Sequence, residues 1–128
     1  MARILCFSDT IAVAFALEQG RDGKHDDVHV LSASSLSDQT RERARQLNPD
    51  VIVLEVTRTL DNPHIFIFLR SDQSTRMIPI ILVSTSNQIA LHAEILGADS
   101  YVHNPFDTHA LWQQIEAHLP HEQAVYAA

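Results

Sequence analysis

One acidic residue at the end of an apolar run is the group best placed to do chemistry in this sequence. Turn residues Asn48 and Pro49 lead into the run Val51–Leu54, and Glu55 follows it directly. An uninterrupted Val- and Ile-rich run is typical of a strand buried on both faces of a parallel sheet. In an open α/β sheet, ligands bind beyond the carboxyl ends of the central strands. Glu55 is therefore a working group, the remnant of one, or a plain solvent-exposed carboxylate.

Other polar side chains follow apolar runs in the same way. Ser8 and Asp9 come after Arg3–Phe7, Ser84 and Thr85 come after residues 79–83, and Asn104 follows residues 101–103. If these runs are parallel strands, their polar ends converge with Glu55 on one crevice.

The elements that would position these groups alternate along the chain. We predict strands at residues 3–7, 28–31, 51–55, 79–83 and 101–103, the second of them at a sheet edge. Helices are predicted at 11–19, from Ser34 or Ser35 to 47, at 64–70, from Ser86 or Asn87 to 96, and from Asp107 or Thr108 to 119. Gly20, Pro49, Gly97 and Pro120 end four of these helices.

The segment His64–Arg70 is ambiguous, because its β-branched and aromatic residues also suit a strand. We predict a helix, since Pro63 suits a first helical position and strands and helices alternate on both sides.

Composition limits the function. The 128 residues predict one domain, and a net charge of −7 argues against binding a nucleic acid backbone. The lone Cys6 excludes an internal disulfide framework and is expected to be an inert core thiol. No signal core or membrane-spanning run is evident, so we expect a soluble, cytoplasmic protein.

Five strands alternating with five helices predict a three-layer α/β/α fold of the flavodoxin-like type. Its parallel sheet would have the strand order 2-1-3-4-5 and right-handed crossovers. Residues 1–119 form the expected domain, and residues 120–128 a C-terminal tail.

Beyond this fold type, the sequence resembles the receiver domain of two-component response regulators, over about residues 3–119. Segments 49–55, 78–85 and 97–107 carry the resemblance in the right order. The last segment is the most specific, because Gly-Ala-Asp, an aromatic residue and Pro-Phe all keep register. The resemblance places this chain's residues in the following positions of the family: Glu55 at the phosphoacceptor aspartate, Ser8, Asp9 and Thr57 in the acidic metal pocket, Ser84 at the hydroxyl position, Tyr101 at the switch aromatic and Asn104 at the lysine.

Three departures from that pattern concern phosphorylation. A working receiver accepts a phosphoryl group on its aspartate, next to a divalent cation and a lysine. Glu55 moves the nucleophilic oxygen by about a bond length, and a misplacement near 1 Å can cost about a hundredfold in rate. Ser8 removes an anionic ligand for a hard cation, and Asn104 removes a fixed positive charge. We therefore expect no catalysis, no cofactor, little or no magnesium binding, and local hydrogen bonds from Glu55 to Asn104, Ser84, Thr85 or Ser8.

The other residues that could bind a metal or catalyse a reaction have simpler structural explanations. The eight His residues form no tight pair on a predicted helix, so most of them are expected to be solvated and none to bind a metal. Ser84 has no His base in a nucleophile-elbow sequence, which disfavours a hydrolase. Asp9 can serve as a cap of the first helix.

The surface formed by the fourth helix, fifth strand and fifth helix is the candidate interface. Leu91 and Ile95 lie off the Ile89–Ala93–Leu96 stripe, and Trp112 lies one residue off the line through Leu111 and Ile115. The candidate contact residues are Leu91, His92, Ile95, His103 and Trp112. Exposed apolar residues suggest a partner, and in receivers this face mediates dimers and output contacts.

We therefore predict a degenerate receiver that acts by protein–protein contact in a signalling phosphorelay without being phosphorylated. It would bind a protein partner or form a homodimer through that face, and bind neither nucleic acid nor membrane. A working receiver with an atypical site is the first alternative. A flavodoxin-like domain that binds a small molecule is the second.

Overall fold

The computed structural model describes residues 3–20, 27–33, 37–56, 64–103 and 108–119. Its strands are β1 (Arg3–Phe7), β2 (Asp27–Leu31), β3 (Val51–Glu55), β4 (Ile80–Ser84) and β5 (Ser100–His103). Its helices are α1 (Ile11–Gly20), α2 (Asp38–Leu47), α3 (His64–Ser71), α4 (Ile89–Leu96) and α5 (Thr108–His118). The proposed tail 120–128 lies outside the described residues.

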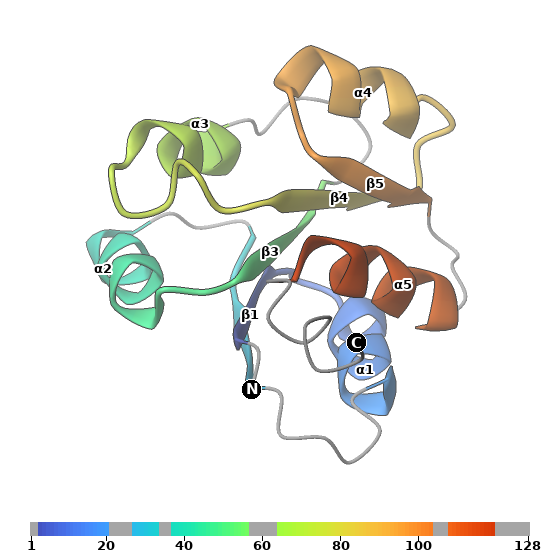
Figure 1. Cartoon of the computed structure of the whole chain (residues 1–128), viewed down its shortest axis with the longest axis horizontal. Helices are drawn as coiled ribbons and strands as arrows, with labels where there is room; N and C mark the ends of the chain where they lie inside the picture. Colours follow the sequence, from blue (N-terminus) through green and yellow to red (C-terminus); the bar gives the residue numbers. More distant parts are fainter. Residues whose placement is uncertain (1–2, 21–26, 34–36, 57–63, 104–107, 120–128) are drawn as a thin grey trace, which may run out of the picture.

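The strands form one parallel sheet in the order β2-β1-β3-β4-β5, as predicted. The helices cover both faces of this sheet (Figure 1). Buried side chains from α1 and α5 form one core with one face of the sheet, and those from α2, α3 and α4 form a second core with the other face. This is the three-layer arrangement that the alternating pattern indicated.

The central strand β3 shows why its sequence has no polar alternation. Val51 and Val53 belong to the core under α1 and α5, whereas Ile52 and Leu54 belong to the core under the other helices. All of its residues are buried. Each buried Val, Ile or Leu side chain stabilises the fold by about 1.5–3 kcal/mol. Because β3 has such side chains on both of its faces, it is most stable in the middle of the sheet.

The ambiguous segment is helix α3, which confirms the prediction made from its context. Ile65, Phe66 and Leu69 are buried at helical spacing, and Ile67 on the opposite side is exposed. The three-residue and four-residue spacing of this stripe outweighs the strand propensity of its residues.

Two helix starts differ from the predictions. Helix α2 begins after Ser37, whose side chain accepts a hydrogen bond from the Thr40 backbone N–H, and not at Ser34 or Ser35. Helix α4 begins after Gln88, which makes no side-chain cap. Ser86 instead accepts a bond from the Gln88 N–H in the turn before that helix, because a hydroxyl competes for nearby backbone groups. Of the two predicted starts of α5, Asp107 lies outside the described residues and Thr108 is the first helical residue.

The predicted helix ends after α2 and α4 are confirmed. Asn48 and Gly97 both adopt the left-handed conformation that closes a helix. No helix among the described residues is long and apolar enough to cross a membrane.

Candidate functional site

Glu55 lies at the carboxyl end of β3, between the ends of β1 and β4. Its side chain is buried, so the solvent-exposed interpretation is wrong. The strand places it there because the four residues before it are fully apolar and fill both cores. A carboxylate at this depth needs hydrogen-bond donors to offset the loss of water.

The turn after β1 provides those donors. Ser8 Oγ donates to Glu55 Oε1 at 2.8 Å, and Thr10 Oγ1 donates to Glu55 Oε2 at 2.8 Å. The Asp9 backbone N–H also donates to Oε1, at 3.3 Å. Both carboxylate oxygens are therefore bound by groups from one short segment.

The bond from Ser8 was predicted and is confirmed, whereas the role of Thr10 was missed. Its signal in the sequence was the Ser-Asp-Thr order directly after an apolar strand. A hydroxyl two residues after Ser8 can reach the same carboxylate, but the sequence alone equally allows it to cap α1. The Thr10 N–H also donates to Ser8 Oγ at 3.2 Å, which orients the Ser8 hydroxyl toward Glu55.

Asp9 faces a different element. Its Oδ1 accepts hydrogen bonds from Ser32 Oγ at 2.8 Å and from the Ala33 N–H at 3.1 Å, in the segment after β2. The carboxylates of Asp9 and Glu55 thus serve different neighbours. Within the described part of the chain, no three His, Cys, Asp or Glu side chains come together as a metal site would require.

The remaining predicted site residues are only partly brought together. Ser84 is buried at the end of β4, where its Oγ accepts a bond from the Ser86 N–H at 3.1 Å. Thr85 is exposed, and the described contacts of Glu55 come from the turn after β1 rather than from these two residues. Thr57 and Asn104 lie outside the described residues, so no contact of theirs is stated.

The negative charge of Glu55 also affects the pKa of a second buried group, the thiol of Cys6. Burial raises the pKa of the Cys6 thiol to about 12, and the negative charge of Glu55 adds to the effect. Cys6 lies in β1, fully inside the core, as predicted. A thiol with so high a pKa stays protonated at neutral pH, which makes it a poor nucleophile.

These residues do not fit a hard divalent cation well. Such an ion prefers several anionic oxygens around it, and the described pocket supplies the Glu55 carboxylate together with neutral hydroxyls. Both Glu55 oxygens already accept short bonds. Chemically, the arrangement holds a carboxylate in place and ties β3 to the β1–α1 turn.

On the candidate interface, Leu91 and Ile95 are exposed at 49% and 62%, which confirms that they lie off the buried stripe of α4. Tyr101 is exposed at 43%, and His103 is also exposed. These four side chains form an accessible surface on α4 and β5.

The expected exposure of Trp112 and His92 is wrong. Trp112 is 6% exposed, and its Nε1–H donates to the Ala16 carbonyl at 3.3 Å, because α5 packs on α1 as well as on the sheet. His92 is 8% exposed, since it follows Ile89 by three residues and shares its side of α4. Its Nδ1 has no hydrogen-bond partner in the described part of the chain.

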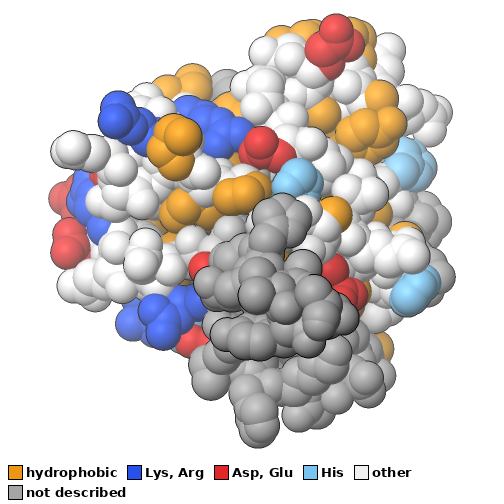
Figure 2. All heavy atoms as spheres, viewed as in Figure 1, with side chains coloured by type: hydrophobic (Ala, Val, Ile, Leu, Met, Phe, Trp, Pro, Cys, Tyr) orange, Lys and Arg blue, Asp and Glu red, His pale blue; other side chains and the backbone are white. Residues whose placement is uncertain are grey.

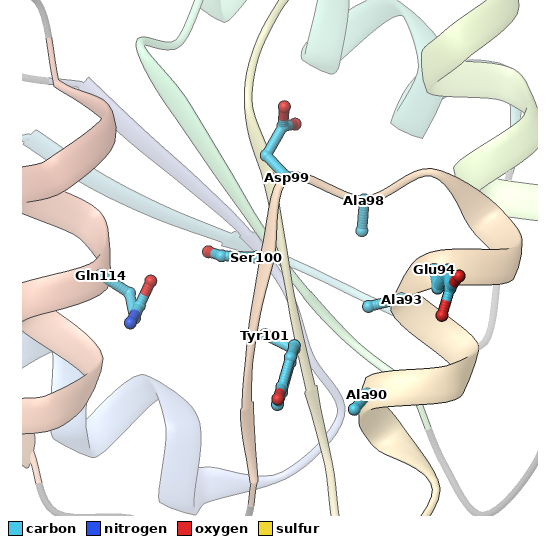
Figure 3. A pocket seen from close by; sticks show the side chains of 8 residues that line it. All are labelled: Ala90, Ala93, Glu94, Ala98, Asp99, Ser100, Tyr101 and Gln114. Carbon is cyan, nitrogen blue, oxygen red and sulfur yellow. The ribbon is translucent and has the colours of Figure 1, made fainter.

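A hollow of about 520 Å³ lies between α4, β5 and α5. Figure 3 shows Ala90, Ala93 and Glu94 on one side of β5 and Gln114 of α5 on the other, with Ser100 pointing toward Gln114. Ala98, Asp99 and Tyr101 complete its lining. Small side chains leave this space open.

Among known proteins, the likeness is one of structure. No family model and no curated protein matches the sequence. The N-terminal domain of the nisin resistance regulator NsrR, a lantibiotic response regulator, is similar with a TM-score of 0.74 and 21% identity, over 94% of this chain and 99% of that one.

Two further solved structures are similar to this chain. The chemotaxis response regulator CheY4 of Vibrio cholerae has a TM-score of 0.72 and 18% identity, over 93% of this chain and 99% of its own. The receiver domain of a Pseudomonas aeruginosa sensor histidine kinase, with magnesium coordinated in its active site cleft, has a TM-score of 0.70 and 18% identity, over 91% of this chain and 96% of its own. The chain therefore has the fold of response-regulator receiver domains, spanning essentially the whole of each.

Proposed function

We propose that this chain is a degenerate receiver domain, which acts in signal transduction through protein–protein contact and not through phosphorylation. The observation that carries the proposal is the state of the Glu55 carboxylate. Both of its oxygens accept hydrogen bonds of 2.8 Å from the hydroxyls of Ser8 and Thr10.

A phosphoacceptor must present one free carboxylate oxygen to the incoming phosphorus. At Glu55 such an attack would first break a hydrogen bond of 2.8 Å, either the buried one from Ser8 or the partly buried one from Thr10. The likeness to receiver domains implies that a cation and a lysine assist phosphorylation, and this chain has Ser8 and Asn104 where those groups are expected. The proposal includes no enzymatic activity and no tight magnesium binding.

The direct test is incubation with a small acyl phosphate and magnesium, followed by intact mass measurement. We expect no added phosphoryl mass. A stoichiometric adduct that is stable to acid and labile to base would show a working receiver and overturn the proposal.

Matched variants identify which group is missing. Glu55→Asp alone should remain unlabelled, because the second acid and the lysine are still absent. The combined change Ser8→Asp, Glu55→Asp and Asn104→Lys should recover magnesium affinity, measured by calorimetric titration. Efficient labelling of the single variant would show that Ser8 and Asn104 are not the obstacles.

With no phosphoryl chemistry, the accessible surface of α4 and β5 is the region we assign to partner contact. Its support is the exposure of Leu91, Ile95 and Tyr101 beside the hollow. Exposed apolar side chains gathered at a hollow are typical of a contact site.

A further inference from the structure

The basic residues of this chain are confined to its first part. All nine Lys and Arg residues lie at or before Arg76. Residues 77–128 contain neither type, while their acidic side chains are Glu94, Asp99, Asp107, Glu116 and Glu122. Of the net charge of −7, most therefore belongs to the part of the sequence that forms β4, α4, β5 and α5.

This division of charge is visible on the surface. In Figure 2 the Lys and Arg side chains lie on the left, over α2 and α3, and none appears on the right beside α4. Among the described residues, Arg70 of α3 is the Arg that reaches the α4–β5 connection. Its guanidinium donates to Asp99 Oδ2 at 2.8 Å and to the carbonyls of Ile78 and Gly97, so its charge is already compensated.

Glu94 lacks such compensation. It lines the hollow and is exposed, and no described residue offers its carboxylate a hydrogen bond or an ion pair. Ala90 precedes it by four residues and Leu91 by three, so both share its side of α4. Glu94 thus forms a negatively charged rim between an alanine-lined hollow and an exposed leucine.

We propose that the partner of this face is a basic amphipathic segment of another protein. Its apolar side chains would enter the hollow beside Ala90, Ala93 and Ala98, and a Lys or Arg would pair with Glu94. This inference rests on the proposed function, and it adds the chemistry of the partner.

Charge complementarity decides between this partner and a second copy of the chain. Two copies meeting through this face would bring acidic groups together, because α4, β5 and α5 supply no Lys or Arg to pair with them. Like charges placed opposite each other disfavour an association, whereas a basic partner removes the repulsion and is attracted from a distance. Of the two occupants predicted from the sequence, a protein partner and a second copy of the chain, the second copy is therefore disfavoured.

The test uses two synthetic amphipathic helical peptides, one of Leu and Lys and its counterpart with Glu in place of Lys. Each is titrated into the ¹⁵N-labelled full chain at low salt, and amide shifts are followed. We expect the Lys peptide to shift the amides of Glu94, Ala98 and Tyr101 in a saturable way, and the Glu peptide to shift none of them.

Three variants make the result specific. Glu94→Lys should weaken binding about three- to tenfold, as charge reversal at an interface rim does. Glu116→Lys is the matched control, since it makes the same charge change on an exposed α5 residue outside the hollow lining, and it should change affinity less than twofold. Ala90→Leu, which fills the hollow from an exposed position, should also weaken binding.

Equal weakening by Glu94→Lys and Glu116→Lys would reveal non-specific attraction and overturn the inference. So would equal binding of both peptides, or sedimentation showing a dimer that Ala90→Leu dissociates. Acyl phosphate labelling tests the proposed function separately. If the chain is labelled and still prefers the Lys peptide, the degenerate-receiver proposal is wrong and the basic-partner proposal stands. If the chain is not labelled and binds neither peptide, the basic-partner proposal is wrong and the degenerate-receiver proposal stands.

Discussion

Two carboxylates of this domain, Glu55 and Glu94, lie in opposite situations. Glu55 is buried at the end of β3, and both of its oxygens accept hydrogen bonds from the turn after β1. Glu94 is exposed on α4 at the edge of a hollow, without a described partner. The Glu55 carboxylate thus has its hydrogen bonds inside the protein, whereas the exposed carboxylate of Glu94 is accessible to a binding partner.

Asp99 lies between these two cases. Its Oδ2 accepts from the Ile80 N–H at 2.8 Å and from Arg70 at 2.8 Å, while its side chain is 38% exposed. In Figure 3 it points away from the other side chains around the hollow. Burial by itself raises the pKa of Asp99, but the bonds from Ile80 and Arg70 outweigh it and leave the pKa lowered.

The largest expected effect concerns Trp112 of α5, which lies in the core and not on the contact surface. Trp112→Ala should lower the free energy of unfolding by about 3–5 kcal/mol, because it removes a buried indole between α5 and α1 and the bond to Ala16. Urea denaturation measures this. A change below about 0.5 kcal/mol would place Trp112 on the surface, where the sequence alone had put it.

The next effect tests whether the Glu55 carboxylate depends on its hydroxyl donors. Ser8→Ala should cost about 1.5–3 kcal/mol, as expected for a buried hydrogen bond to a charged group. Thr10→Val keeps the shape of the side chain and removes the second donor, but it should cost less, because Thr10 is exposed and its bond is only partly buried. If both variants unfold at the wild-type urea concentration, these bonds do not hold the carboxylate.

A smaller, pH-dependent effect is expected for Asp99. Because its pKa is lower in the folded state, its contribution is present above the unfolded value near 4 and is lost as pH falls through the folded value. Asp99→Asn should therefore cost about 1 kcal/mol at pH 7, after allowance for solvent screening, and less at pH 3. Unfolding curves at the two pH values measure this, and an equal loss at both would contradict the charged pairing.

The smallest expected effect concerns the contact face itself. Leu91→Asp should change the free energy of unfolding by no more than about 0.5 kcal/mol, because the side chain is already 49% exposed. Ile81→Ala, in the core, is the matched contrast and should cost several times more. Comparable losses in the two variants would show Leu91 to be packed, and the surface would lose its support as an interface.

The covered parallel sheet could be predicted from the sequence alone. Continuous apolar runs such as Val51–Leu54 must be buried on both faces, and helical stripes between them leave little choice but a covered parallel sheet. The same logic placed Ser8 near Glu55, since the carboxyl ends of neighbouring parallel strands adjoin.

Two features could not be predicted from the sequence: which side chains at the margin of a helical stripe face outward, and which groups donate hydrogen bonds to a buried carboxylate. Trp112 and His92 lie at the margin of their stripes, and a helix that packs on two neighbours buries a wider arc than one stripe. Thr10 was equally suited to capping α1, and only the path of the turn brings its hydroxyl to Glu55. Periodicity fixes the direction of a side chain only to within about one residue step, so contacts at such margins depend on how the elements pack together.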